Sequence, residues 1–236
     1  MLTIRRFMIV ALSVAFAITA ARSDWFIAQN PVTGNPEAVW SNPQSGGSSD
    51  VLYSYLDGAS WAPSTNLSSI GKESPVLAFD PNGARKVAWG TSETTGRILL
   101  RTQAASGGAW SSEIVISDPS EASSQPSAIV SDENTYVSYE AAATGGARSV
   151  ICGMIDPGSN VGRTLVTSTS YNSPLVPLIH SDQGYLWIDW IDSSSYLGYS
   201  VLTKGEWKEV SYESYTGESD IKDGRERIRA NVLAGQ

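Results

Sequence analysis

Cysteine and histidine are almost absent from this sequence of 236 residues. The single cysteine, Cys152, excludes an internal disulfide, and the single histidine, His180, excludes a metal site built from several histidines. Basic side chains are also scarce, because 16 Lys and Arg stand against 24 Asp and Glu and give a formal net charge of −8. A protein that binds nucleic acid by electrostatic attraction needs a basic face. We therefore expect neither a metal or other cofactor nor a nucleic-acid partner.

Long apolar runs are lacking except at the N-terminus. Residues 1–6 end in two arginines, residues 7–19 are almost all apolar, and Ala21-Arg22-Ser23 then offers a cleavage site. This order is typical of an export signal, and the apolar run is too short to span a bilayer. We expect residues 1–23 to be a signal peptide and the remaining chain to be secreted or periplasmic, with no stable membrane span after cleavage. Because Cys152 ends an apolar run, we expect its thiol to be buried and inert.

Helical periodicity is lacking as well, whereas turn-forming and aromatic residues are plentiful. The chain contains 21 Gly, 11 Pro, 8 Trp and 10 Tyr. This composition is too apolar and aromatic for a disordered chain and too rich in glycine and proline for a helical bundle. Short segments rich in Val, Ile, Trp and Tyr alternate with turn residues, a pattern that predicts β-strands. We therefore expect an all-β protein.

Four sequence markers recur with a period of about 49 residues. They are a proline at the start of the first predicted strand in three of the repeats, an aromatic in the second strand, an apolar residue in the third and a tryptophan before or in the fourth. In that order the residues are Pro75, Pro126 and Pro174; Trp40, Trp89, Tyr139 and Trp190; Tyr53, Leu100, Ile151 and Tyr199; and Trp61, Trp110 and Trp207. The last pair of tryptophans is two periods apart, so the third repeat lacks this marker.

Each repeat has the length and turn pattern of a propeller blade, with four short antiparallel strands. A blade is apolar on both faces and is stable only when it stacks on its neighbours. We therefore expect residues 24–236 to form an all-β, β-propeller-like domain of four blades of four antiparallel strands. The repeats cover about 24–70, 71–122, 123–170 and 171–216.

Residues 217–236 have two interpretations. Gly217 lies three periods after Gly71, and Asp223-Gly224 could form a hairpin turn, which favours an incomplete fifth blade. The spacing of Ile221, Ile228 and Val232 would also suit an amphipathic helix. An incomplete blade would leave an open edge, and we expect such an edge to be a contact for homo-oligomer formation.

The segment SPVLAFDPNGARKVAWG at 74–90, with GRILLRTQAASGGAW at 96–110, resembles the secreted sialidase-like propellers whose blades carry the bacterial neuraminidase repeat, or Asp-box. The resemblance covers residues 24 to about 211 as architecture. The family pattern is S-x-D-x-G-x-T-W, and Ser54, Gly58 and Trp61 match it whereas Leu56 replaces the first Asp. Weaker copies keep the glycine and the tryptophan. Those residues are Gly108 and Trp110, and Gly205 and Trp207.

The resemblance implies what a sialidase would need: a six-bladed ring, three arginines that clasp the substrate carboxylate, a Tyr/Glu nucleophile pair and an acid Asp. The first of those arginines belongs to an Arg-Ile-Pro motif, which is missing here, and no Arg lies between Asp24 and Arg85. We therefore predict a non-enzymatic binding module for extracellular carbohydrate or a protein partner. The alternatives are a sialidase-like glycoside hydrolase and a degenerate propeller with a structural role.

The fourth repeat departs from the others on the second predicted strand. On the face opposite the regular aromatic, only this repeat places a large aromatic, Trp187, and a carboxylate, Asp189, two residues apart. An indole beside a hydrogen-bond acceptor suits a sugar ring, so we predict a ligand site formed by Trp187 and Asp189, with Asp192 and Tyr196 from the following loop. The alternative is that Trp187 packs between blades and Asp189 is a structural polar group. Asp189 and Asp192 point to opposite faces of a strand, which argues against a catalytic pair.

Overall fold

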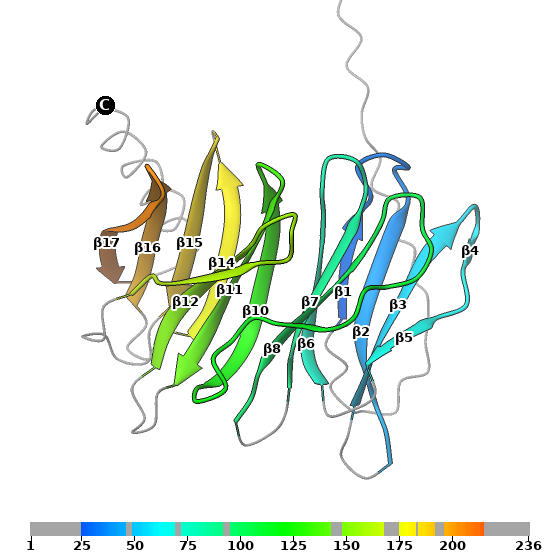
Figure 1. Ribbon diagram of the computed structural model, residues 1–236, viewed down its shortest axis with the longest axis horizontal. Coiled ribbons are helices and arrows are strands. Elements are labelled where there is room, and N and C mark those ends of the chain that lie inside the picture. The colour runs from blue at the N-terminus through cyan, green and yellow to red at the C-terminus, as the bar shows by residue number, and fades with distance from the viewer. Residues whose placement is uncertain are drawn as a thin grey trace, which may run out of the picture.

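The computed structural model describes residues 25–45, 49–68, 72–91, 95–142, 148–167, 175–182, 184–191 and 196–214. Within these ranges the chain forms seventeen β-strands and no helix, which confirms the predicted all-β class. The strands make four antiparallel sheets that follow one another in chain order (Figure 1). The predicted signal peptide and the predicted partial repeat at 217–236 lie outside the described residues.

Each sheet is a meander of consecutive strands. The first sheet contains β1 (Trp25–Gln29), β2 (Pro36–Pro43), β3 (Ser49–Asp57), β4 (Ser60–Trp61) and β5 (Thr65–Ser68), and the last two both pair with β3. The second contains β6 (Lys72–Phe79), β7 (Arg85–Thr91), β8 (Ile98–Gln103) and β9 (Ile114–Val115). The third contains β10 (Ala122–Ser131), β11 (Asn134–Ala142), β12 (Arg148–Ile155) and β13 (Val161–Leu165). The fourth contains β14 (Leu175–Asp182), β15 (Tyr185–Ile191), β16 (Tyr196–Thr203) and β17 (Glu206–Ser214).

The sheets stack as the blades of a propeller do. The first strand of each sheet lies against the first strand of the next, and the sheets fan out from these strands (Figure 1). A buried apolar cluster fills each of the three contacts between successive sheets. Burial of these side chains on both faces of the second and third sheets is the main force that holds the stack together.

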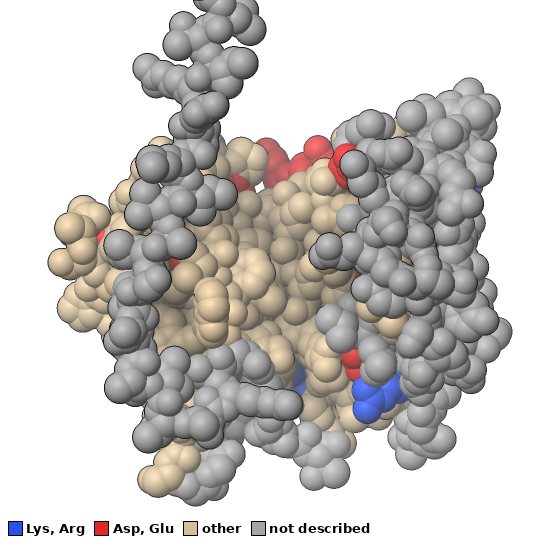
Figure 2. Space-filling model, turned by 180° about the vertical axis from the view of Figure 1, so that it is seen from behind, with Lys and Arg blue, Asp and Glu red and all other residues tan. Residues whose placement is uncertain are grey.

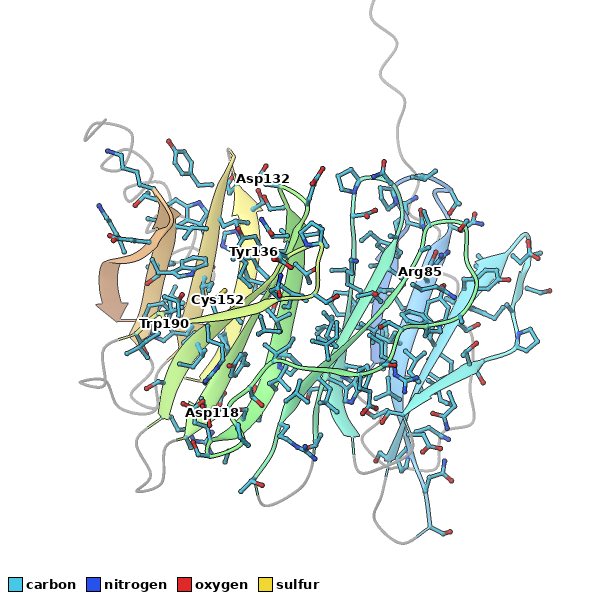
Figure 3. The ribbon with its side chains drawn as sticks, in the orientation of Figure 1. Arg85, Asp118, Asp132, Tyr136, Cys152 and Trp190 are labelled. Carbon is cyan, nitrogen blue, oxygen red and sulfur yellow. The ribbon has the colours of Figure 1, made fainter. Side chains whose placement is uncertain are left out.

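The predicted second-strand aromatics mark these contacts. Trp89 on β7, Tyr139 on β11 and Trp190 on β15 are fully buried, because each packs on the sheet that precedes it. Figure 3 shows Trp190 close to Cys152 of β12, a member of the same cluster. Burial raises the pKa of the Cys152 thiol, which agrees with the prediction of an inert cysteine. Trp40 on β2 is only half-buried, since no described sheet lies on that side of the first sheet.

The proline marker needs one correction. The pairing between first and second strands shifts at equivalent places in three sheets, between Glu73 and Val76, between Ser124 and Ser127, and between Leu175 and Leu178. These bulges contain Pro75, Pro126 and Pro177, which are spaced by 51 residues. Pro177 is therefore the equivalent of the other two, in place of the predicted Pro174, which lies outside the described residues. A bulge accommodates a proline because its missing N–H breaks no ladder hydrogen bond there.

Whether the predicted fourth-strand tryptophans are covered also depends on the place of their sheet in the stack. Trp110 meets Tyr53 edge to face, with ring centroids 5.1 Å apart, in the contact between the first and second sheets. Trp207 packs against the cluster between the third and fourth sheets. Trp61 ends the β3–β4 hairpin, whose turn contains Gly58 with a φ of 61°. It remains 37% exposed on the side of the first sheet that no described sheet covers.

Gly198 on β16 provides a test of the stacking geometry, because it is the cross-strand neighbour of Trp190. A Cβ atom at this position would overlap the six-membered ring of the buried indole. We expect Gly198→Ala to lower the free energy of unfolding by about 1–3 kcal/mol, the usual cost of overpacking a core. Chemical denaturation measures this change.

Gly162 on β13 supplies the matched control. Its Cβ would make only ordinary contacts, at 3.9 Å, with Met154. Gly162→Ala should change the stability by no more than about 0.5 kcal/mol. Equal effects of the two substitutions would contradict the packing of Trp190 over Gly198.

Candidate functional site

The predicted ligand residues lie on the fourth sheet, on the face turned away from the third sheet. Trp187 and Asp189 share this face of β15, as their spacing requires. Trp187 is 4% exposed and packs with Leu197, Tyr199 and Val201. Its indole ring therefore has no free face for a sugar in this structure. Asp192 lies outside the described residues, and only the backbone of Tyr196 is described.

Asp189 is buried and bonded to the single histidine. Its Oδ2 atom lies 3.1 Å from Nε2 of His180, which extends from the neighbouring strand β14. The aspartate is 5% exposed, whereas the imidazole is partly open to solvent. The sequence offered the carboxylate as a ligand acceptor but did not indicate this partner, which the register of the β14–β15 hairpin brings beside it, since His180 pairs with Trp187 and Leu178 with Asp189. The structure joins Trp187, Asp189 and His180 on one face.

A second polar cluster, which sequence reasoning missed, links the first and second sheets. The carboxylate of Glu37 on β2 is bound by Arg85 of β7, whose Nε and Nη2 atoms donate to its two oxygens at 2.7 and 2.8 Å. The Tyr53 hydroxyl donates to Glu37 at 2.5 Å and Nδ2 of Asn30 donates at 2.8 Å. Figure 3 places Arg85 at the end of the stack that contains the first and second sheets. No local sequence pattern marks Glu37 as a member of such a cluster.

Tyr53, Glu37 and Arg85 are the residue types of a sialidase nucleophile pair with an arginine beside it. Their environment is different, because Tyr53 and Glu37 are both buried in the contact between two sheets. Burial, followed by the hydrogen bond to Glu37, raises the pKa of Tyr53 well above its usual range, so the phenol stays protonated. For Arg85 burial opposes the charge, but the hydrogen bonds and the electrostatic attraction of Glu37 and Tyr53 together outweigh it and raise the pKa. The cluster therefore connects the first sheet to the second.

Two further arginines bind carboxylates in the third sheet. Arg148 donates to the buried Glu140 at 2.7 Å. Arg163 of β13 donates to the Tyr139 hydroxyl at 3.0 Å and also contacts Asp118 and Glu121 in the segment that leads into β10. Arg163 thus ties an outer strand to the connection between the second and third sheets, at the lower end of the stack where Figure 3 labels Asp118.

The buried carboxylates of the described residues share one property. All three are bound by a basic side chain from a neighbouring strand or sheet. The pairs are Glu37 with Arg85, Glu140 with Arg148, and Asp189 with His180. A buried carboxylate that is held by another side chain is not placed to face a substrate as a general acid or base.

Two further features concern only the part of the chain that the structure describes. No group of three or more His, Cys, Asp or Glu side chains is placed there to hold a metal ion. No helix among the described strands and turns has the length and apolar character needed to cross a membrane.

Comparison with known proteins identifies relatives in fold alone. No family model matches the chain, and no curated protein matches its sequence. A thermostable family-43 glycoside hydrolase superposes with a TM-score of 0.56 at 9% identity, over 81% of this chain and 75% of that one. A protein of unknown function from Dyadobacter fermentans gives a TM-score of 0.63 at 9% identity, over 81% of this chain and 69% of that one.

The sialidase of Trypanosoma rangeli is also similar, with a TM-score of 0.56 at 14% identity, over 79% of this chain but only 37% of the sialidase. The glycoside hydrolase and the sialidase are both β-propellers, which confirms the predicted fold class. Identities this low show the architecture and transfer no active-site residue.

The ion pair between Glu37 and Arg85 predicts a large stability effect. Glu37→Gln removes the negative charge and leaves the nearly buried guanidinium without a counter-charge. We expect the free energy of unfolding to fall by about 3 kcal/mol, since breaking one side of a buried pair costs far more than the pair contributes. Equilibrium denaturation of the variant measures the loss.

The pair between Glu113 and Arg101 is the control, because it is longer, at 3.8 Å, and both side chains are partly exposed. Glu113→Gln should cost less than about 0.5 kcal/mol. If Glu37→Gln were as mild as Glu113→Gln, the Glu37 cluster would have no structural role.

Proposed function

We propose that this chain is an exported, non-enzymatic module that binds extracellular carbohydrate. The observation that carries the proposal is the pairing of each buried carboxylate of the described residues with a basic side chain. Hydrolysis of a glycosidic bond needs one carboxylic acid and one free carboxylate facing each other across the substrate. Carboxylates that are buried and held by another side chain do not meet this need.

The fold supports the choice of carbohydrate over other ligands only as an analogy. The propellers to which it is similar include a glycoside hydrolase and a sialidase. We further infer that residues 54–61 are a degenerate Asp-box, because they form the β3–β4 hairpin that ends in Trp61. In this view the chain kept the scaffold of a sugar-processing propeller without its acid–base machinery.

The second candidate is a sialidase-like glycoside hydrolase, and the observation that favours it is the Tyr53–Glu37 hydrogen bond beside Arg85. A nucleophile must reach the substrate, whereas Tyr53 and Glu37 are buried between two sheets. The binding module therefore remains our preferred function, and a protein ligand is the outcome to be distinguished from a glycan.

An activity screen separates the two candidates. We expect the purified protein to leave a panel of fluorogenic glycosides, including a sialoside, unhydrolysed while it binds members of a glycan array. Turnover that Glu37→Gln or Asp189→Asn abolishes would establish a hydrolase. If the protein binds no glycan on the array, the result would favour a protein partner.

The predicted fourth-sheet site needs its own test, and Asp189→Ala is the informative change. If Asp189 accepts a hydrogen bond from a ligand, the variant loses binding at an unchanged melting temperature. If Asp189 is structural, the melting temperature of the variant falls and the variant still binds the ligand. Its burial and its bond to His180 favour the second result, and we expect a drop of about 5 °C in the melting temperature. Scanning calorimetry together with glycan binding of the same variant decides between them.

A further inference from the structure

The outer face of the first sheet, meaning the side turned away from the second sheet, is rich in exposed indoles. Strand register places Trp25 of β1 directly opposite Trp40 of β2, and Trp61 of β4 on the same side. Trp25 is 67% exposed, Ile27 is 47% exposed and Trp61 is 37% exposed. Exposed apolar side chains that share one face of a sheet mark an interaction surface.

Stacking order explains why this face is open. Trp89, Tyr139 and Trp190 occupy the position of Trp40 in the other sheets, and the preceding sheet buries each of them. The first sheet has no described predecessor, so its aromatic face meets solvent.

The face is also specialised, because the first strand differs here from its equivalents. β6, β10 and β14 each carry a bulge with a proline at the position of Trp25, whereas β1 pairs with β2 without a register shift. Trp25 and Trp40 are therefore direct cross-strand neighbours, with Cβ atoms about 5 Å apart. Two adjacent indoles make an apolar area wide enough for the face of a sugar ring.

Polar groups flank the indoles. Asn42 lies two residues after Trp40 on the same face of β2, and it pairs across the strands with Asp50 of β3. Nε2 of Gln44 donates to Oδ2 of Asp50 at 3.1 Å, which holds the carboxylate in place. An amide and a carboxylate beside an aromatic surface match the hydroxyl groups at the edge of a sugar.

Trp61 extends the surface to the far side of the sheet. The Ser54 hydroxyl donates to the Ala62 carbonyl at 2.6 Å, and the Ala62 amide donates to the Tyr55 carbonyl at 2.9 Å, so the chain around Trp61 is fixed. By strand geometry, Trp61 lies about 17 Å from Trp40. A single sugar cannot bridge this distance, whereas several linked rings can.

We propose that the outer face of the first sheet binds a neutral polysaccharide chain across Trp25, Trp40 and Trp61. The inference rests on the proposed carbohydrate-binding function and names its site and ligand class. The ligand is neutral because Asp50 lies in the site and the chain carries a net charge of −8, both of which repel anionic glycans. Figure 2, which shows the molecule from behind, has acidic side chains at the upper edge of the described surface and basic ones near its lower edge.

A second copy of the chain is the competing occupant. A two-fold dimer through this face would bring the two Asp50 carboxylates into one interface. Like charges in a shared interface destabilise it, so the face favours a neutral glycan over its own copy.

The test is affinity gel electrophoresis of the full chain with hydroxyethyl cellulose, xylan or galactomannan in the gel, and with polygalacturonate as the anionic probe. We expect at least one neutral polymer to retard the protein and polygalacturonate to leave it unaffected. Trp25→Ala and Trp61→Ala should each weaken the affinity roughly tenfold or more, because one stacking ring is lost. Tyr55→Ala is the matched control, since Tyr55 is 41% exposed on β3 but points to the opposite face.

Each other result overturns the proposal in a distinct way. Neutral polymers that retard Trp25→Ala as strongly as the parent would remove this site and leave the proposed function standing. Binding to polygalacturonate alone would overturn the ligand class. No retardation by any polymer, together with an empty glycan array, would overturn the function itself. A dimer in light scattering that Trp25→Ala converts to a monomer would show that a second copy occupies the face. Unchanged melting temperatures ensure that each variant is folded.

Discussion

Face-to-face contact between successive sheets is the interaction on which the rest of this structure depends. A four-stranded sheet that is apolar on both faces cannot be stable alone, so each must be covered by a neighbour. Trp89, Tyr139 and Trp190 supply the largest buried side chains of these contacts. The same contacts hold the polar links, because the Glu37–Arg85 pair crosses from the first sheet to the second. Desolvation makes such links costly unless the buried charge is well bound, and Glu37 accepts four hydrogen bonds from Asn30, Tyr53 and Arg85.

The stacking also decides where chemistry could take place. Side chains between sheets are committed to packing, so Tyr53 and Glu37 resemble a nucleophile pair in composition but are kept from solvent. The three buried carboxylates are in turn held by Arg85, Arg148 and His180. A ligand must therefore meet the molecule at its rims or at the end of the stack. The exposed indoles of the first sheet lie at such an end.

The sequence was informative about the fold for a physical reason. Packing on the preceding sheet places an aromatic at the same position in the second, third and fourth sheets, so Trp89, Tyr139 and Trp190 carry the period directly into the sequence. Trp40 extends this period to the first sheet. Bulges are less visible, because proline is tolerated at several neighbouring positions, and Pro174 was taken for Pro177. Contacts between sheets leave no local pattern at all. Arg85 is 48 residues from Glu37, and nothing in either segment indicates that they meet.

The candidate sites were also only partly predictable from the sequence. Trp187 and Asp189 stood out because their repeat differs from its siblings, yet the sequence could not show that Leu197, Tyr199 and Val201 pack against the indole. Trp40 looked like its three equivalents, and its different environment follows only from its place in the stack. An aromatic that is a core residue in the second, third and fourth sheets is a surface residue in the first. A repeat protein can therefore expose a surface with the composition of an interior, without a new motif, where no neighbouring sheet covers it.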